Sequence, residues 1–370
     1  MKLFCHRPTF TAAMQLVSAV VPTRTPKDIL KNVKLVAANG TVTLIATDQE
    51  IGIRYEVPGV EADVGGEILL PTSRVISILR ELQDDGVTIE ATSDQIKISS
   101  GTSEFKLASE DAAEFPPVAS FDGDEWYTVP GKSLKEMIRR TAFATDVEST
   151  RYALGGVLME IVDTKMTLAA TDSRRLAVVE SPITANGGVK PPESNPVVPT
   201  KAMTLVERTI SDDETGVDIS VRENEVLIRS GRATIYSRLV EGRFPRYADV
   251  IPKTATEQVD LVTAPFHGAI RQAQIVTNEE SRGVDFNFAN DTLTLTSKAA
   301  EIGQSKVELP IGFSGDEITI TFDPRYVAEF LRVLGPEKQV TLNLIDGENA
   351  AVFKTDDNYT YVIMPLSRDR

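Results

Sequence analysis

The sequence predicts an α+β protein made of three repeated domains, each with two helices packed on antiparallel sheets. The first observation is a repeated segment: TLIATD at residues 43–48 returns as TLAATD at 167–172, and a weaker copy, TLTLTS, follows at 292–297. The second is that successive copies lie about 125 residues apart, which is domain-sized and too long for a solenoid or propeller unit. The third is that each copy mixes helical periodicity with alternating apolar runs.

The first helix of each domain is expected at residues 8–21, 131–144 and 265–277, where apolar residues recur at helical spacing. The N-terminal segment also contains a short apolar stretch that could pass for a secretory signal. Gln15 and Ser18 interrupt that stretch, so a buried amphipathic helix is the better interpretation. No other window approaches the roughly 20 apolar residues that a membrane span needs, so no membrane partner is expected.

The second helix of each domain is expected directly after Pro71, Pro199 and Pro324, because proline is favoured at the start of a helix. Alternating runs such as VKLVA, VLMEI and LTLTL predict half-buried strands around these helices. The segments FDGDEW and PKTATEQ look like connectors. We therefore expect three domains, at residues 1–125, 126–254 and 255–370.

Composition restricts the function further. The 370 residues include 39 Lys and Arg against 54 Asp and Glu, a formal net charge of −15. This excludes a uniformly basic protein that coats nucleic acid, but not a local basic surface. The single cysteine, Cys5, cannot form an internal disulfide, which favours a cytoplasmic location. One cysteine with His6 and His267 cannot supply a usual structural zinc site, and no metal or cofactor is expected.

The expected helices are basic although the chain is acidic. Lys201 and Arg208, and likewise Arg325 and Arg332, are seven residues apart and so lie on one helical face. If the three domains turn such helices to one side, the surface suits a polyanion that is held by charge and not by base readout. For any single residue, a solvated helix face is the simpler interpretation.

Catalytic signatures are hard to find. The sequence contains no GxxxxGK[ST], HExxH or GxSxG motif, and no GxGxxG after a strand. Asp48 and Asp172 in the repeated ATD could be paired carboxylates for metal or acid–base chemistry. Each ends an expected strand at a turn, however, where Asp commonly accepts hydrogen bonds from local backbone. The structural interpretation is favoured, and we do not expect an enzyme.

Together these features resemble the bacterial DNA polymerase III β subunits, the sliding clamps, over the whole chain. The most specific segments are RYALGG at 151–156, TDSRRLA at 171–177, RFPRYADVIP at 243–252, RGV at 282–284 and MPL at 364–366. The resemblance implies a head-to-tail homodimer whose domains close into a ring. Such a ring performs no chemistry: it encircles duplex DNA without sequence specificity and tethers polymerases as a processivity factor.

The resemblance also implies a pocket for a short QLxLF-like peptide. The proteins that carry such a peptide would be the catalytic subunit of the replicative DNA polymerase, repair polymerases, ligase and mismatch-repair proteins. An ATP-driven clamp loader would open the ring. The implied pocket residues are Leu154, Thr171, Ser173, Arg174, Arg175, Leu176, Pro245, Val250, Val362, Met364, Pro365 and Leu366. Leu and Met provide an adaptable apolar socket. Ser173, Arg174, Asp249 and Ser367 depart from the family pattern, so the peptide preference could differ.

Two further sets of residues follow from the same resemblance. The implied DNA-facing residues are Arg24, Arg74, Arg80, Arg139, Arg140, Lys201, Arg208, Arg271 and Arg332. The implied dimer interface brings Phe105 and Leu107 against Ile275 and Val276 of a second copy. Both apolar pairs are equally plausible as ordinary core.

Two other functions stay open at this point. One is an enzyme that uses Asp48 and Asp172 with a divalent metal. The other is a repeat-built scaffold that binds proteins but never DNA. Retention on circular DNA until the circle is cut separates a clamp from both.

Overall fold

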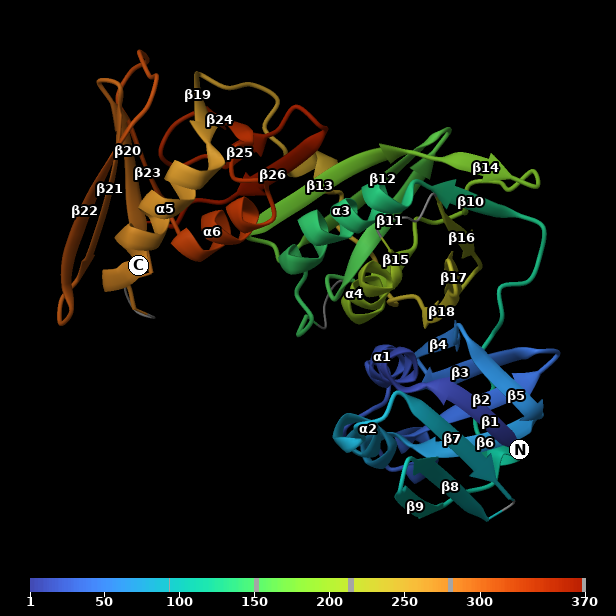
Figure 1. The fold of residues 1–370 in the computed structure, drawn as a ribbon. Helices are drawn as coiled ribbons and strands as arrows, with labels where there is room; N and C mark the ends of the chain where they lie inside the picture. The colour runs from blue at the N-terminus through green and yellow to red at the C-terminus, as the bar shows by residue number, and fades with distance from the viewer. Residues whose placement is uncertain (93, 150–152, 212–215, 279–281, 368–370) are drawn as a thin grey trace. The chain divides into compact units, whose positions relative to one another are not determined.

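The computed structural model describes residues 1–370 except 93, 150–152, 212–215, 279–281 and 368–370. The chain divides into two compact units: unit 1 contains residues 1–135 and 182–239, and unit 2 contains residues 136–181 and 240–370. Each unit combines helices with antiparallel sheets, as predicted (Figure 1).

Unit 1 contains a five-stranded and a nine-stranded sheet. The smaller sheet has the order β5 (Val60–Val64), β1 (Lys2–His6), β7 (Gly86–Ala91), β8 (Gln95–Ser100) and β9 (Ser103–Ala108). The larger sheet has the order β14 (Thr184–Asn186), β10 (Trp126–Val129), β16 (Val217–Val221), β17 (Glu225–Ser230), β18 (Ala233–Arg238), β4 (Ile51–Glu56), β3 (Thr41–Thr47), β2 (Asn32–Ala38) and β6 (Gly66–Pro71). The antiparallel pairing of β18 with β4, with Ile235 opposite Ile53, joins strands of the first two sequence repeats.

Unit 2 repeats this arrangement. Its larger sheet runs β11 (Gly156–Val162), β12 (Lys165–Thr171), β13 (Arg175–Pro182), β26 (Tyr359–Ile363), β25 (Ala351–Lys354), β24 (Gln339–Leu344) and β19 (Glu257–Val262). Its four-stranded sheet runs β22 (Gly303–Pro310), β21 (Thr292–Ala299), β20 (Val284–Ala289) and β23 (Ile318–Phe322). β13 pairs with β26 so that Leu176 lies opposite Val362, which joins the second and third repeats.

The helices form where periodicity predicts them. They are α1 (Arg7–Ser18), α2 (Thr72–Glu81), α3 (Gly131–Thr141), α4 (Thr200–Thr209), α5 (Thr263–Ala273) and α6 (Pro324–Arg332). Short 3₁₀ turns are η1 (Asp28–Lys31), η2 (Ala112–Glu114), η3 (Ala142–Ala144), η4 (Tyr247–Val250) and η5 (Gln274–Val276), and a short strand, β15 (Val197–Pro199), precedes α4. α1 and α2 lie side by side, as do α5 and α6 (Figure 1). None of the described helices is long and apolar enough to cross a membrane.

Helix α6 illustrates why these segments fold as they do. Pro324 occupies the first turn, and the Asp323 carboxylate accepts a hydrogen bond from the Arg325 N–H, which caps the helix. Its apolar face is fully buried, and the Phe330 ring stacks on Tyr361 of β26 with 4.7 Å between ring centroids. Burial of a side chain of this size contributes about 2–3 kcal/mol, so α6 holds β26 and the edge of the site described below.

Candidate functional site

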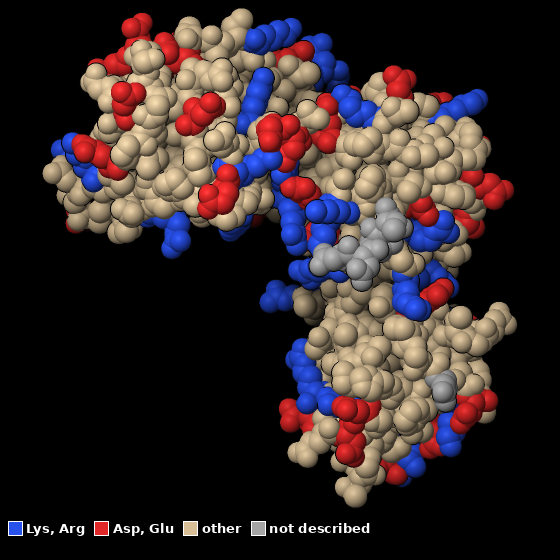
Figure 2. Space-filling view, turned by 45° about the horizontal axis from the view of Figure 1, so that its top comes forward, with Lys and Arg blue, Asp and Glu red and all other residues tan. Residues whose placement is uncertain are grey.

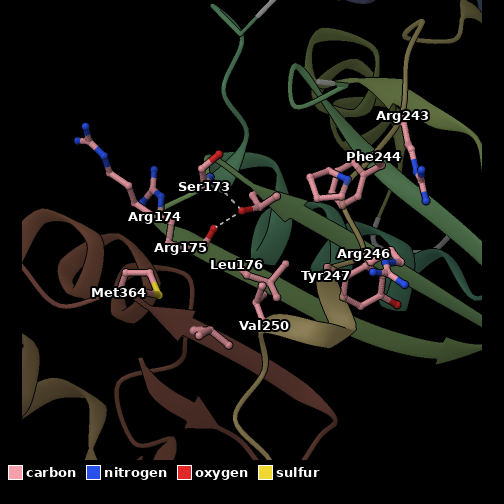
Figure 3. A pocket seen from close by; sticks show the side chains of 13 residues that line it. Ser173, Arg174, Arg175, Leu176, Arg243, Phe244, Arg246, Tyr247, Val250 and Met364 are labelled. Atoms are coloured by element: carbon pink, nitrogen blue, oxygen red, sulfur yellow. Dashed lines mark hydrogen bonds between the residues drawn. The ribbon is translucent and has the colours of Figure 1, made fainter. Parts of the chain in front are cut away.

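A cavity of about 520 Å³ opens in unit 2, where strands of the second and third repeats meet (Figure 3). Its lining residues are Thr171, Ser173, Arg174, Arg175, Leu176, Arg243, Phe244, Pro245, Arg246, Tyr247, Val250, Val362 and Met364. Leu176 is buried, whereas Val250 and Met364 are about half exposed. The arrangement is a closed apolar floor with an apolar rim that is accessible to a partner.

The pairing of β13 with β26 builds the floor. Leu176 and Val362 are directly opposite each other in the two strands. After β26, the N–H of Met364 donates to the carbonyl of Arg174 at 2.8 Å, which carries the ladder one step beyond the last strand residue. Met364 is therefore fixed at the mouth of the cavity by its backbone, while its flexible thioether side chain remains exposed.

A tight turn between β12 and β13 forms a second wall. The Asp172 carboxylate accepts hydrogen bonds from the N–H groups of Arg174 and Arg175, both at 3.0 Å. The Thr171 hydroxyl donates to the Arg175 carbonyl at 2.6 Å and accepts from the Ser173 N–H. Ser173 has φ of 73°, in the left-handed region that glycine adopts most easily. Asp172 is thus used in backbone hydrogen bonding, as the structural interpretation of the ATD segment predicts.

Arg175 is buried behind this turn. Its guanidinium donates to Asp172 at 3.0 Å, to Glu329 and to the Phe143 carbonyl at 2.8 Å, and it lies 4.5 Å from the centre of the Tyr326 ring. Burial alone would lower the pKa of Arg175, but interactions with its neighbours, including Glu329, raise it above its usual value. Arg175 is a permanently charged support for the wall.

The third wall comes from the segment around η4. The Tyr247 hydroxyl donates to Glu160 on β11 at 2.6 Å, and its ring meets the Phe244 ring edge-on. Burial, reinforced by Glu160, raises the pKa of Tyr247 above its usual range, so the hydroxyl remains a donor. Arg246, which also lines the cavity, forms an exposed ion pair with Asp249 at 3.2 Å.

The structure brings most of the sequence-predicted pocket residues to this cavity. They are Thr171, Ser173, Arg174, Arg175, Leu176, Pro245, Val250, Val362 and Met364. The placement of Leu154 is corrected, because Leu154 is absent from the lining of this cavity. The placement of Pro365 and Leu366 in this cavity is also corrected. The N–H of Leu366 donates to the Thr321 carbonyl, and both residues line a separate, polar cavity.

Sequence reasoning missed four residues of the lining: Arg243, Phe244, Arg246 and Tyr247. All four lie in the quoted segment RFPRYADVIP. The signal that could have found them is the same segment's alternation of cationic and aromatic residues, because a proline-interrupted loop can turn neighbouring side chains to one side.

Most of the predicted DNA-facing residues are exposed. They are Arg24, Arg74, Arg80, Arg139, Lys201, Arg208, Arg271 and Arg332. Figure 2 shows Lys and Arg groups interspersed with Asp and Glu groups on the face it presents, so the net charge of −15 is not spread as a uniform acidic coat there. On α5, partial burial and the charges of Arg271 and Arg332 lower the pKa of His267. These two arginines therefore contribute to one positive field.

Arg140 is a correction to the predicted DNA-facing set. It is only 4% exposed, and its guanidinium pairs with Glu136 and with Asp357 at 2.9 Å while lying over the Tyr359 ring. Burial alone would raise the pKa of Asp357, but hydrogen bonds from Arg140 and Lys338 hold it well below its usual value. Arg140 is a structural ion-pair residue and not a surface cation.

The predicted interface residues lie at exposed sheet edges and turns. β9 is an edge strand of the five-stranded sheet in unit 1, and it carries Phe105, which is 36% exposed, and the half-buried Leu107. In unit 2, η5 carries Ile275, which is 74% exposed, and the half-buried Val276. β22, which packs on η5, is an edge strand of its sheet. Within the described residues, no group of His, Cys, Asp and Glu is placed to hold a metal ion.

Comparison with known proteins covers almost the whole chain. Family models of the DNA polymerase III beta subunit match in three parts: the N-terminal domain at residues 1–119, the central domain at 128–246 and the C-terminal domain at 248–367. The beta sliding clamp of Escherichia coli K12 is 28% identical over 369 residues, which is 99% of this chain and 100% of that protein. That of Chlamydia trachomatis serovar D is 28% identical over 367 residues, 99% of this chain and 87% of the relative.

Solved structures agree with the sequence relatives. The sliding clamp of Bacillus subtilis superposes with a TM-score of 0.91 at 26% identity, covering 99% of both chains. A Pseudomonas aeruginosa clamp gives a TM-score of 0.90 at 28% identity, again covering 99% of both chains. The predicted α+β fold of three repeated clamp domains is confirmed. The chain belongs to the DNA polymerase III beta subunits, which are the non-catalytic sliding clamps that encircle DNA and make DNA polymerase processive.

Proposed function

We propose that two copies of this chain associate head to tail into a ring around duplex DNA, and that the cavity beside Met364 receives a short apolar peptide from each protein that the ring tethers. The observation that carries this proposal is the cavity itself, with its buried floor at Leu176 and its accessible apolar rim at Val250 and Met364. A domain division at 1–125, 126–254 and 255–370 is part of the proposal.

Two unpaired sheet edges support the ring. Among the described strands, β9 and β22 each have a neighbour on one side only, so each presents backbone groups that a second chain can pair with. Phe105 on β9 and Ile275 beside β22 are exposed apolar side chains at these edges. An edge from unit 1 of one copy joined to an edge from unit 2 of the other is a head-to-tail contact. Two such contacts close a dimer.

Exposed cations support the encirclement of DNA without sequence readout. In the described part of the chain, Arg74, Arg80, Arg208, Arg271 and Arg332 have no carboxylate within ion-pair distance. Contacts between such side chains and phosphates do not depend on the DNA sequence. If only a few of these contacts form at any one time, the ring can still slide along the duplex.

The finer partners follow from the peptide site. We propose that the replicative polymerase, repair polymerases, ligase and mismatch-repair proteins compete for the cavity through peptides of the QLxLF type, and that an ATP-driven loader opens the ring. A cytoplasmic location is proposed because the chain has a single cysteine and works on DNA.

Peptide binding is tested by fluorescence anisotropy with a labelled QLSLF peptide. Wild-type protein should give saturable binding near micromolar Kd, roughly −8 kcal/mol. Met364→Ala should weaken binding by roughly tenfold, since it removes the rim contact without disturbing the core. Val162→Ala is the matched control: Val162 is similarly exposed in unit 2 and is absent from the cavity lining. Equal affinity of both variants would remove Met364 from the site.

Dimer closure is tested by sedimentation. Ile275→Asp should convert the dimer to a folded monomer, because a charge at an apolar contact is poorly solvated when the contact closes. Val147→Asp, at a residue of similar exposure in unit 2, is the control and should leave the dimer intact. The ring is then tested on DNA: wild-type clamp loaded on a nicked circle should stay bound until the circle is linearised. Loss at the same rate from circular and linear DNA would contradict encirclement.

A further inference from the structure

The wall of the peptide cavity is positive although the protein is acidic. Its described lining includes Arg174, Arg175, Arg243 and Arg246, and no Asp or Glu. The whole chain carries a net charge of −15. A cavity lined in this way concentrates positive potential at the place where a partner peptide enters, because field lines are focused in a concave surface of one charge sign.

These arginines differ in how far their charge is compensated. Arg175 is buried and held by Asp172 and Glu329, so its charge is used inside the protein. Arg246 has a partner, Asp249, but both side chains are mostly exposed, and such a pair contributes little.

The remaining two arginines keep more of their charge. Arg174 is exposed; it interacts with the Tyr326 hydroxyl and, at longer range, with the carboxylates of Asp172 and Asp323. Arg243 is also exposed. Among the described residues, no carboxylate lies within ion-pair distance of either guanidinium. The least compensated charge of the lining is therefore that of Arg243, and Arg174 and Arg246 contribute in part.

The exposed arginines stand at opposite ends of the apolar floor. Figure 3 shows Arg174 beyond Ser173 on the side of Met364, and Arg243 and Arg246 on the other side, next to Phe244 and Tyr247. Leu176 and Val250 lie between the two ends. A peptide whose apolar residues occupy the floor has both of its flanks within reach of a cation.

We infer that the cavity selects apolar peptides that carry carboxylates on both flanks. This inference rests on the proposed peptide site and adds the chemistry of the preferred partner: apolar anchors supply the contact area, and the flanking carboxylates supply selectivity and faster association. Arg174 acts at one flank, and Arg243 with Arg246 acts at the other. Asp249 limits the contribution of Arg246, because it competes with the peptide carboxylate for the same guanidinium.

The test uses three labelled peptides with the same QLSLF centre, flanked on each side by two Glu, two Gln or two Lys. The Glu-flanked peptide should bind roughly tenfold more tightly than the Gln-flanked one at low salt, since each exposed ion pair contributes about 0.2–1 kcal/mol. The difference should shrink as salt is raised to 1 M, where the Debye length falls to about 3 Å. The Lys-flanked peptide should bind most weakly.

Variants assign the preference to the named residues. Arg174→Glu combined with Arg243→Glu should reverse the order, so that the Lys-flanked peptide binds more tightly than the Glu-flanked one. Arg232→Glu combined with Lys190→Glu changes the net charge equally at exposed positions outside the cavity, and it should keep the wild-type order. Asp249→Asn should increase the preference for Glu flanks.

The possible results separate this inference from the site on which it rests. Equal affinity for Glu-flanked and Gln-flanked peptides would overturn the inference while leaving the peptide site intact. A Glu-flanked peptide with a GGSGG centre that binds equally well would also overturn it, since charge alone would then explain the binding. Failure of every QLSLF peptide to bind would overturn the proposed site and the inference together.

Discussion

Two turns in this protein have the same backbone but different uses. Thr47 and Asp48 begin the turn after β3, and Thr171 and Asp172 begin the turn after β12. In both, the carboxylate accepts hydrogen bonds from the N–H groups two and three residues later. In both, the threonine hydroxyl donates to the carbonyl four residues later. The repeat therefore supplies one rigid strand connection to two places in the chain.

The difference lies in the side chain three residues after the aspartate. In the first turn this is Ile51, which is buried in the core, and Asp48 pairs instead with the half-exposed Lys201 from α4. In the second turn it is Arg175, which is buried between two carboxylates and lines the cavity in unit 2. The turn is therefore structural in both repeats, and the side chain at one position decides whether it also contributes to a cavity wall.

The largest effect is expected when Arg175 is replaced by Leu. The change leaves the partly buried Asp172 and Glu329 without their cation, which should cost about 3 kcal/mol of unfolding free energy in urea. Ile51→Val is the control at the equivalent position and should cost about 1 kcal/mol, because only one buried methyl group is lost. Similar losses in the two variants would mean that the two turns are supported in the same way.

Removal of the two aspartates should give smaller and unequal effects. Asp172→Ala deprives two N–H groups of an acceptor and removes one partner of buried Arg175, so we expect a loss of about 2–3 kcal/mol. Asp48→Ala removes the same backbone bonds but only a half-exposed lysine contact, so about 1–2 kcal/mol is expected. Urea midpoints of the two variants measure the difference, and a larger loss for Asp48→Ala would reverse the comparison.

The sequence predicts much of this architecture because helices, strands and turns depend mainly on residues that are close together in the chain. The repeated ATD segments mark equivalent turns, and the periodicity at 131–144 predicts a helix that the structure divides into α3 and η3. Arg140 shows the limit of such reasoning. Periodicity gives the angle of a side chain around a helix, but the carboxylate that draws Arg140 inward belongs to Asp357, 217 residues away.

The same limit applies to the cavity. Thr171 to Leu176 and Val362 to Met364 could be named from short segments, but their approach depends on the pairing of β13 with β26 across the chain. Tyr247 was missed because its orientation depends on Glu160, a residue of another strand. Leu154 and Leu366 are implied by the family resemblance, and a motif that marks a segment does not tell which of its apolar residues face a cavity and which face the core.

Relief of backbone strain should stabilise both turns slightly and equally. Ser173 and Gln49 occupy equivalent positions with φ of 73° and 80°. A non-glycine residue pays about 1–2 kcal/mol to adopt the left-handed conformation. Replacing it with glycine removes this strain but lowers the free energy of unfolding by about 0.4–1 kcal/mol, because glycine gives the unfolded chain more conformational freedom. Ser173→Gly and Gln49→Gly should each gain about 0.5 kcal/mol in urea unfolding. A gain in only one variant would show that the two turns are not equally strained.

The smallest effect is expected for Lys201→Ala, which breaks the ion pair of the first turn. Lys201 donates to Asp48 at 2.6 Å, but half of its side chain is exposed, so water can replace it at the carboxylate. Exposed pairs of this kind contribute about 0–1 kcal/mol, and the carboxylate keeps its two backbone donors. The urea midpoint should therefore stay close to that of wild type, and Lys201→Met, which keeps the length of the apolar stem, should behave alike. A loss of more than about 1.5 kcal/mol of unfolding free energy would mean that this exposed pair stabilises its turn as strongly as the buried ion pairs of Arg175 stabilise theirs. The proposed energetic difference between the two turns would then be wrong.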